Sequence, residues 1–121
     1  MSTTTTTSFD LGLLKQAIEE RDASTQLAMY AQDAEVTLID KLATPSSPRV
    51  LHGRAEIESW LADVCGRDMT HRVQQTVRDA DGAAFIEACR YPDGTAVTCA
   101  TVLELSAGRV ARQVVVQAWD D

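Results

Sequence analysis

The sequence predicts an α+β domain in which N-terminal helices pack on a strongly bent antiparallel sheet and enclose a pocket. Apolar residues recur at helical spacing in the first half of the chain, and four strand-length runs follow residue 68, separated by turns that contain glycine. Residues 27–61 read as helix, strand, proline-containing loop and helix. That order is typical of a small domain whose sheet bends around a pocket with a helical lid.

Three helices are expected. The first begins at Asp10, an N-cap residue, and carries one apolar stripe. A second short helix ends near Tyr30. The third begins at Gly53 and ends at Gly66, with apolar residues at i, i+3, i+4 and i+7, which is the clearest helical pattern in the chain.

The remaining segments alternate like strands. A strand is expected over residues 34–40, a loop over 41–49 and a short edge strand over 50–52. Four longer strands of an antiparallel meander are expected at residues 70–78, 83–91, 95–105 and 109–119.

The hairpin between the second and third of these long strands fixes which side chains share a face. If Asp93 and Gly94 are its two loop residues, Ala88 faces the same side as Cys99. The opposite face then carries Phe85, Glu87, Cys89 and Tyr91 against Thr98, Ala100 and Val102. That face is too apolar for a sheet surface in water, so we expect a homodimer formed through the outer face of the sheet.

Composition excludes several classes of protein. The 121 residues, 45% hydrophobic and 24% charged, fit one globular domain, expected at 10–121, after a flexible Thr/Ser-rich tail at 1–9. With 18 acidic and 11 basic residues, the net charge of −7 repels phosphate backbones, so nucleic acid is not expected as a partner. No apolar run approaches the roughly 20 residues that span a bilayer, which predicts a cytoplasmic protein without a membrane partner.

Cofactor and metal motifs are missing from the sequence. The three cysteines form no CxxC pair and are expected to be small buried residues in a reducing compartment. There is no glycine-rich phosphate loop and no GxSxG motif, so no cofactor is expected. His52, His71 and Asp40 lack the spacing of a metal motif, and no metal site is expected.

The segments YAQDAEV, LHGRAEI and AGRVARQVVVQAWD occur in an order that resembles the SnoaL-like and ketosteroid-isomerase-like branches of the nuclear transport factor 2 superfamily. The resemblance covers Asp10 to Trp119. It implies a cone in which the sheet and the helices enclose a mostly apolar pocket, often in a dimer. Members include isomerases, cyclases, dehydratases, epoxide hydrolases and proteins without chemistry, so the fold does not decide the function.

The family's isomerase residues do not carry over. The matching segments put the general base at Leu38, the oxyanion tyrosine at Leu14 and the protonated aspartate near Thr101. None of these side chains can perform those roles, which disfavours classical ketosteroid isomerisation. Asp40 lies two residues beyond Leu38 on the same strand face and is a candidate replacement for the base.

Two residues are candidates for catalysis. His71 shares parity with Val73 and so could point into the cone as an acid or base, although a hydrogen-bonded core histidine would give the same pattern. Asp40 would need a pKa raised by burial, and a solvated aspartate at a strand end is the alternative. The residues expected to contact a ligand are Tyr30, Leu38, Trp60, Thr101, Gln113, Gln117 and Trp119.

Some of these contact residues have a plainer interpretation. Trp60 also fits a core position on its helix, and Tyr30 also fits packing between helices. Gln113 and Gln117 share one face of the last strand, and a rotation of that strand would turn both outward.

Two functions therefore remain. The chain is expected to be a small cofactor-independent enzyme, an isomerase, cyclase or dehydratase, that acts by proton transfer on an apolar small molecule. The alternative is a non-catalytic module that binds a small ligand or supports dimerisation. An enzyme should hold an ionisable group deep in its pocket, whereas a binding module needs none.

Overall fold

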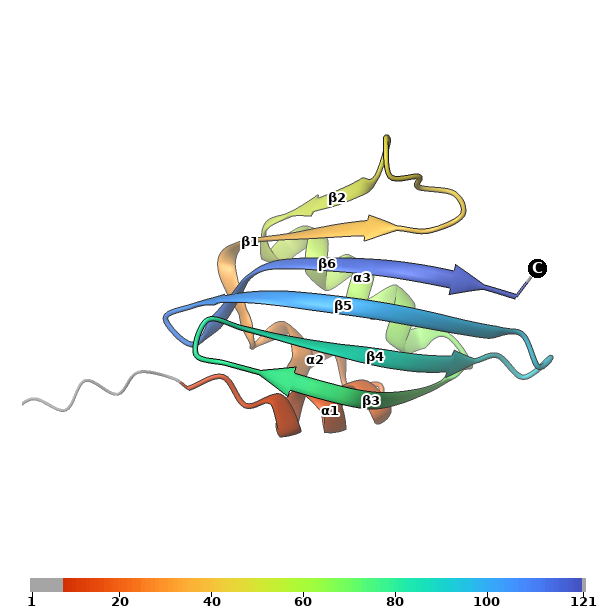
Figure 1. Cartoon of the computed structure of the whole chain (residues 1–121), viewed down its shortest axis with the longest axis horizontal. Helices are drawn as coiled ribbons and strands as arrows, with labels where there is room; N and C mark the ends of the chain where they lie inside the picture. The colour runs from red at the N-terminus through yellow and green to blue at the C-terminus, as the bar shows by residue number, and fades with distance from the viewer. Residues whose placement is uncertain (1–7, 121) are drawn as a thin grey trace, which may run out of the picture.

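In the computed structural model, which describes residues 8–120, six strands form one sheet with the helices packed on one face (Figure 1). The elements are α1 (Leu11–Glu19), α2 (Ala23–Leu27), β1 (Tyr30–Ile39), β2 (Arg49–His52), α3 (Gly53–Gly66), β3 (Thr70–Arg78), β4 (Gly82–Arg90), β5 (Ala96–Ser106) and β6 (Arg109–Trp119). The predicted α+β class is confirmed. Within the described residues no helix is long and apolar enough to cross a membrane.

The strands lie in the order β2-β1-β6-β5-β4-β3. All neighbours are antiparallel except β1 and β6, which run parallel, so the expectation of a wholly antiparallel sheet is wrong at this pair. Consecutive strands of the meander from β3 to β6 run in opposite directions, and the last of them, β6, lies beside β1 and runs in the same direction as β1. Turn residues predict hairpins between consecutive strands, but they carry no information on a pairing of strands this distant in sequence.

Side-chain caps fix the start of the two N-terminal helices. The Asp10 carboxylate accepts the backbone N–H of Leu13 at 3.0 Å, and Asp22 accepts that of Thr25 at 3.1 Å. These contacts satisfy donors that have no partner inside a helix. Helix α2 ends at Leu27, however, and Tyr30 is the first residue of β1 rather than the end of a helix.

The core lies between the helices and the inner face of the sheet. Val36 and Leu38 of β1 point into it, and Ile57 and Leu61 of α3 meet them from the helical side. Phe9 also belongs to the core, with 4% of its surface exposed and the guanidinium of Arg78 5.3 Å from its ring centre. The packed chain therefore begins before Asp10. Residues 1–7 of the expected tail lie outside the described residues.

The hairpin between β4 and β5 has a three-residue loop, Pro92, Asp93 and Gly94, closed by a 2.9 Å bond from the Tyr91 N–H to the Thr95 carbonyl. Gly94 has a φ of 92°, the left-handed conformation that glycine adopts without strain. The expected two-residue loop is thus wrong by one residue. A one-residue change in register exchanges the two faces of a strand, so Glu87 and Cys89 point inward with Cys99, and Ala88 points outward.

Candidate active site

A cavity of about 90 Å³ lies between the helices and the inner face of the sheet. Leu14, Ile18, Leu61, Phe85 and Val115 give it a largely apolar wall. Seven of the residues singled out from the sequence also line it: Tyr30, Trp60, His71, Thr101, Gln113, Gln117 and Trp119. The inward orientation of β6 accounts for the last three of these.

His71 is an ionisable residue in the wall of this cavity, and only 4% of its side chain is exposed. Strand β3 carries it, and α1 holds that strand in place because Glu19 accepts the Val73 N–H at 2.9 Å. His71 lies directly opposite Cys89 in the β3–β4 register, and Glu87 lies opposite Val73. Directly opposite and diagonal side chains on one face of a sheet come into contact, which brings His71, Cys89 and Glu87 together.

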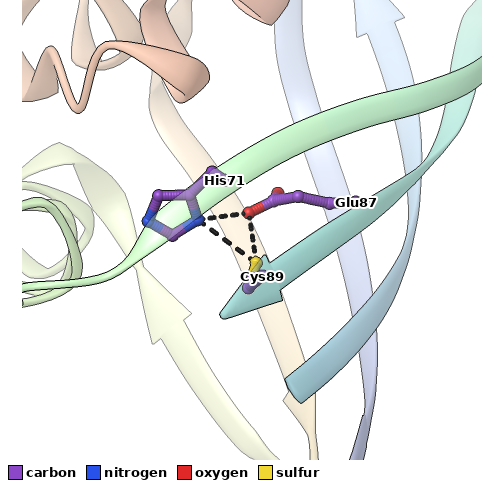
Figure 2. Close-up of side chains that lie close together, drawn as sticks. All are labelled: His71, Glu87 and Cys89. Atoms are coloured by element: carbon purple, nitrogen blue, oxygen red, sulfur yellow. Dashed lines mark hydrogen bonds and ion pairs between the residues drawn. The ribbon is translucent and has the colours of Figure 1, made fainter. Parts of the chain in front are cut away.

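Three contacts join these side chains (Figure 2). His71 Nδ1 lies 2.7 Å from Glu87 Oε2 and 3.2 Å from Cys89 Sγ, and the thiol donates to the same Glu87 oxygen at 3.0 Å. An ionised carboxylate only accepts, so the hydrogen between His71 and Glu87 lies on Nδ1. The other ring nitrogen, Nε2, points away from both partners (Figure 2). With the hydrogen on Nδ1, a neutral imidazole has its lone pair on Nε2.

Cys89 is not built to act as a nucleophile. A hydrogen bond with Cys99, burial and the charge of Glu87 together raise its pKa far above the ordinary range of a thiol. The reactive form of cysteine is the thiolate, and none forms here near neutral pH. Cys89 therefore serves the cluster as a hydrogen-bond donor to Glu87.

The same three side chains offer one nitrogen, one oxygen and one sulfur within 4.8 Å of one another, a set that transition metals accept. A tetrahedral ion with bonds of 2.0–2.3 Å holds such atoms about 3.3–3.6 Å apart. The observed separations of 2.7, 3.0 and 3.2 Å are shorter and match hydrogen bonds. A metal would have to push the three side chains apart and displace the thiol proton, so the geometry fits the hydrogen-bonded cluster better.

Tyr30 and Gln113 form a second polar pair in the cavity wall. The Tyr30 hydroxyl donates to Gln113 Oε1, which joins the start of β1 to β6. Burial raises the pKa of Tyr30 well above its usual range, so the phenol stays neutral and does not act as a base. Gln113 points inward as a partner of Tyr30, and its orientation needs no ligand to explain it.

A wider cleft of about 600 Å³ adjoins the cavity, beside the β1–β2 loop and the C-terminal end of β6. In Figure 1 these two segments lie at the same end of the sheet. Cavity and cleft share the wall residues Trp60, Val64, Arg67, Gln117 and Trp119. The cleft is therefore the natural entrance to the site.

Two predicted site residues lie in the cleft and not in the cavity. Leu38 is buried in the cleft wall. Asp40 also lines the cleft, but its carboxylate accepts the backbone N–H groups of Leu42 and Ala43, both at 2.8 Å. This bonding makes Asp40 the cap of its own turn, and the structure does not bring it together with His71.

Sequence reasoning missed Glu87 and Cys89 as site residues. Both were placed on the outer face by the two-residue loop, whereas the alternative of a three-residue hairpin loop with glycine in the left-handed position puts them inside. The sequence YPDGT contains the signal for that alternative, because Gly94 can occupy the third loop position as well as the second.

A family model described as a SnoaL-like domain matches residues 13–113. The comparison with curated proteins yields no match. The family-model match confirms the resemblance to SnoaL-like proteins that was predicted from the sequence.

Several solved structures share the fold. A protein of Kribbella flavida provisionally assigned as a ketosteroid isomerase is 19% identical, with a TM-score of 0.74 over 91% of this chain and 74% of its own. A loop-truncation variant of IdmH is 21% identical, with a TM-score of 0.65 over 87% of each chain. A SnoaL-like protein of unknown function from Burkholderia thailandensis is 16% identical, with a TM-score of 0.64 over 91% of this chain and 90% of its own. At these identities the likeness establishes the fold alone.

Proposed function

The chain belongs to the SnoaL-like domain family, and we propose that it is a small enzyme that moves a proton on a carbonyl-bearing apolar molecule with its own side chains. One observation carries this proposal: the buried His71 is held at Nδ1 by Glu87 and leaves Nε2 unbonded to either partner (Figure 2). A base in this arrangement is oriented in advance, which is the requirement for general acid–base catalysis.

The reaction follows from the geometry of the cluster. Nε2 accepts a proton from the carbon beside the substrate carbonyl, and the electron pair of that C–H bond moves into an enolate. The Glu87 carboxylate stabilises the imidazolium that forms. In a substrate with a double bond between its β and γ carbons, return of the proton to the γ carbon shifts that double bond and isomerises the substrate. In a β-hydroxy carbonyl compound, the enolate electron pair expels the hydroxyl group, which takes the proton and leaves as water.

Gln117 is the candidate donor for the developing oxygen charge. Its Oε1 accepts the indole N–H of Trp119 at 3.0 Å. This bond fixes the amide plane and leaves the two amide N–H groups of Gln117 pointing away from Trp119. Gln117 lies where the cavity meets the cleft. Amide donors aimed at a forming oxyanion are a general means of lowering such a barrier. The neighbours provisionally assigned as isomerases, from Kribbella flavida and Rhodopseudomonas palustris, support the same reaction class.

The alternative function is ligand binding without turnover. The cavity of about 90 Å³ is well below the roughly 300–1,000 Å³ of sites that enclose a drug-sized ligand, which favours a small guest or one that enters only in part. In that case His71 and Glu87 would be a satisfied polar pair in the core.

Proton exchange distinguishes the two functions. Ketones that raise the melting temperature of the protein would be incubated with it in D₂O, and deuterium entry beside the carbonyl followed by NMR. We expect exchange with the natural protein and a loss of about 100-fold or more in His71→Gln, which removes the base. Thermal stabilisation by the same ketone should remain in the variant. Equal exchange rates in the two proteins, or stabilisation without exchange in either, would support binding alone.

We also propose that the protein is a homodimer joined through the outer face of the sheet. Val102 is 55% exposed beside Val114 at 40%, and the next pair across β5 and β6 joins Ala100 to Val116, which is 44% exposed. These four apolar side chains form one surface that a second copy would cover.

Ala100→Lys should convert the dimer to a monomer, because a lysine at this position would bury a charge between the two sheets. Sedimentation velocity measures the change. Leu42→Lys is the matched control, since Leu42 is 90% exposed in the β1–β2 loop and its substitution should leave the mass unchanged. A natural protein that sediments as a monomer, or an Ala100→Lys variant that remains dimeric, would refute the interface.

A further inference from the structure

The size of the cavity limits how much of a ligand can reach His71. The inner chamber measures about 90 Å³ and the cleft outside it about 600 Å³, and five residues belong to both walls. A polycyclic molecule therefore cannot lie wholly inside. Only a compact end can enter, and the rest must lie in the cleft, whose wall shares Trp60 and Trp119 with the cavity.

The cleft reverses the charge balance of the chain. Acidic residues outnumber basic ones by 18 to 11 over the whole sequence, yet the cleft wall contains Lys41, Arg49 and Arg67 and one acid, Asp40. Asp63, outside that wall, pairs with Arg67, and the balance around the cleft is still one positive charge in excess. The Asp40 carboxylate is turned toward the N–H groups of its own loop. Cations gathered in a cleft of an acidic protein create a local positive potential that attracts anions.

Arg67 is placed where an anion in the cleft would meet the mouth of the cavity. Its guanidinium donates to Asp63 at 2.6 Å and to the Tyr91 hydroxyl at 3.1 Å, which fixes the plane of the group. A guanidinium has five N–H donors, and these two bonds leave three of them. A fixed guanidinium with free donors suits a carboxylate, which accepts two parallel bonds.

Flat apolar surfaces lie beside these cations. Tyr91 and Trp119 are stacked with ring centres 5.9 Å apart and planes at 25°, and Lys41 Nζ lies 4.8 Å from the centre of the Trp119 ring. Such rings bind the face of a planar ligand. The wall thus offers a base inside the cavity, aromatic faces and Arg67 where the cavity meets the cleft, and Lys41 and Arg49 in the cleft.

We infer that the substrate is an aromatic or polycyclic carboxylate whose carbonyl end enters the cavity while its carboxylate is held in the cleft by Arg67 and Arg49. This inference names the substrate class for the same site and rests on the proposed function.

A matched pair of probes tests it: 6-acetyl-2-naphthoate and its neutral analogue 6-acetyl-2-naphthamide, which share the ring and the ketone. Calorimetry at 50 mM salt should give a dissociation constant at least about tenfold lower for the carboxylate. The ratio should fall toward one at 0.5 M salt, because ions screen exposed charges. Equal affinities, or failure of both probes to bind, would overturn the inference.

Substitutions in the cleft test whether its arginines cause the preference for the carboxylate probe. The double substitution Arg49→Gln and Arg67→Gln should abolish the ratio between the probes, and Arg49→Gln alone, which leaves the Arg67 contacts intact, should reduce it. Arg72→Gln is the control, since Arg72 is an exposed residue of β3 that does not line the cleft, and it should keep the full ratio. A ratio that survives the double substitution would place the anion elsewhere.

His71→Gln separates this inference from the proposed function. The variant lacks the base, so it should exchange no proton and yet prefer the carboxylate as the natural protein does. If the natural protein prefers the carboxylate probe but exchanges no proton, the proposed catalysis is refuted and the inferred substrate class is kept. If the natural protein exchanges protons but binds both probes equally, the inferred substrate class is refuted and the proposed catalysis is kept.

Discussion

Glu87→Gln should slow proton exchange by about 10²- to 10⁴-fold while the protein remains folded. The carboxylate holds the hydrogen of His71 on Nδ1 and stabilises the imidazolium. An amide can donate its own N–H to Nδ1, which moves the histidine hydrogen to Nε2 and removes the lone pair that takes the proton. NMR measurement of deuterium entry into a bound ketone gives the rate directly.

The matched control is Glu104→Gln. Glu104 is an exposed acid of β5, and its carboxylate lies 4.0 Å from Arg112 on the outer face of the sheet. This variant makes the same change of charge away from the cavity and should exchange at the natural rate. A Glu87→Gln protein with a normal rate would mean that His71 acts without its partner, or that it is not the base.

Ile57→Ala should lower the free energy of unfolding by about 2–5 kcal/mol. Ile57 is fully buried in α3 where this helix packs on β1, and the substitution would leave a void that the surrounding side chains fill only in part. Urea denaturation followed by circular dichroism measures the loss.

Leu42→Ala is the comparison for this measurement. Leu42 is 90% exposed, so its truncation should change the free energy of unfolding by less than about 0.5 kcal/mol. A cost below about 1 kcal/mol for Ile57→Ala would show that α3 is not packed on the sheet as described.

Local signals predicted the elements well because each one acts within a few residues. Asp10 caps its helix through a bond to a residue three positions on, and buried Val36 and Leu38 alternate with half-buried neighbours along β1. The parallel pairing of β1 with β6 and the burial of Phe9 against Arg78 depend on contacts between distant segments. No local pattern records such contacts.

The candidate site shows the same division. The parity of His71 with Val73 indicated that His71 points inward, and both side chains are buried. Whether its partner Glu87 points inward depends on the length of the loop at Asp93 and Gly94. Loops of two and of three residues both satisfy the turn chemistry, and only packing decides between them. The bond from Tyr30 to Gln113 joins residues 83 positions apart, and the sequence offered no reason to pair them.

The most direct test of the account is the tautomer of His71, measured by long-range ¹H–¹⁵N NMR and assigned by comparison with His71→Gln, since His52 is the other histidine of the chain. The account predicts that the neutral imidazole carries its hydrogen on Nδ1, bonded to Glu87, with a lone pair on Nε2. A neutral imidazole with its hydrogen on Nε2 would contradict it, because the nitrogen assigned to accept the proton would already hold one.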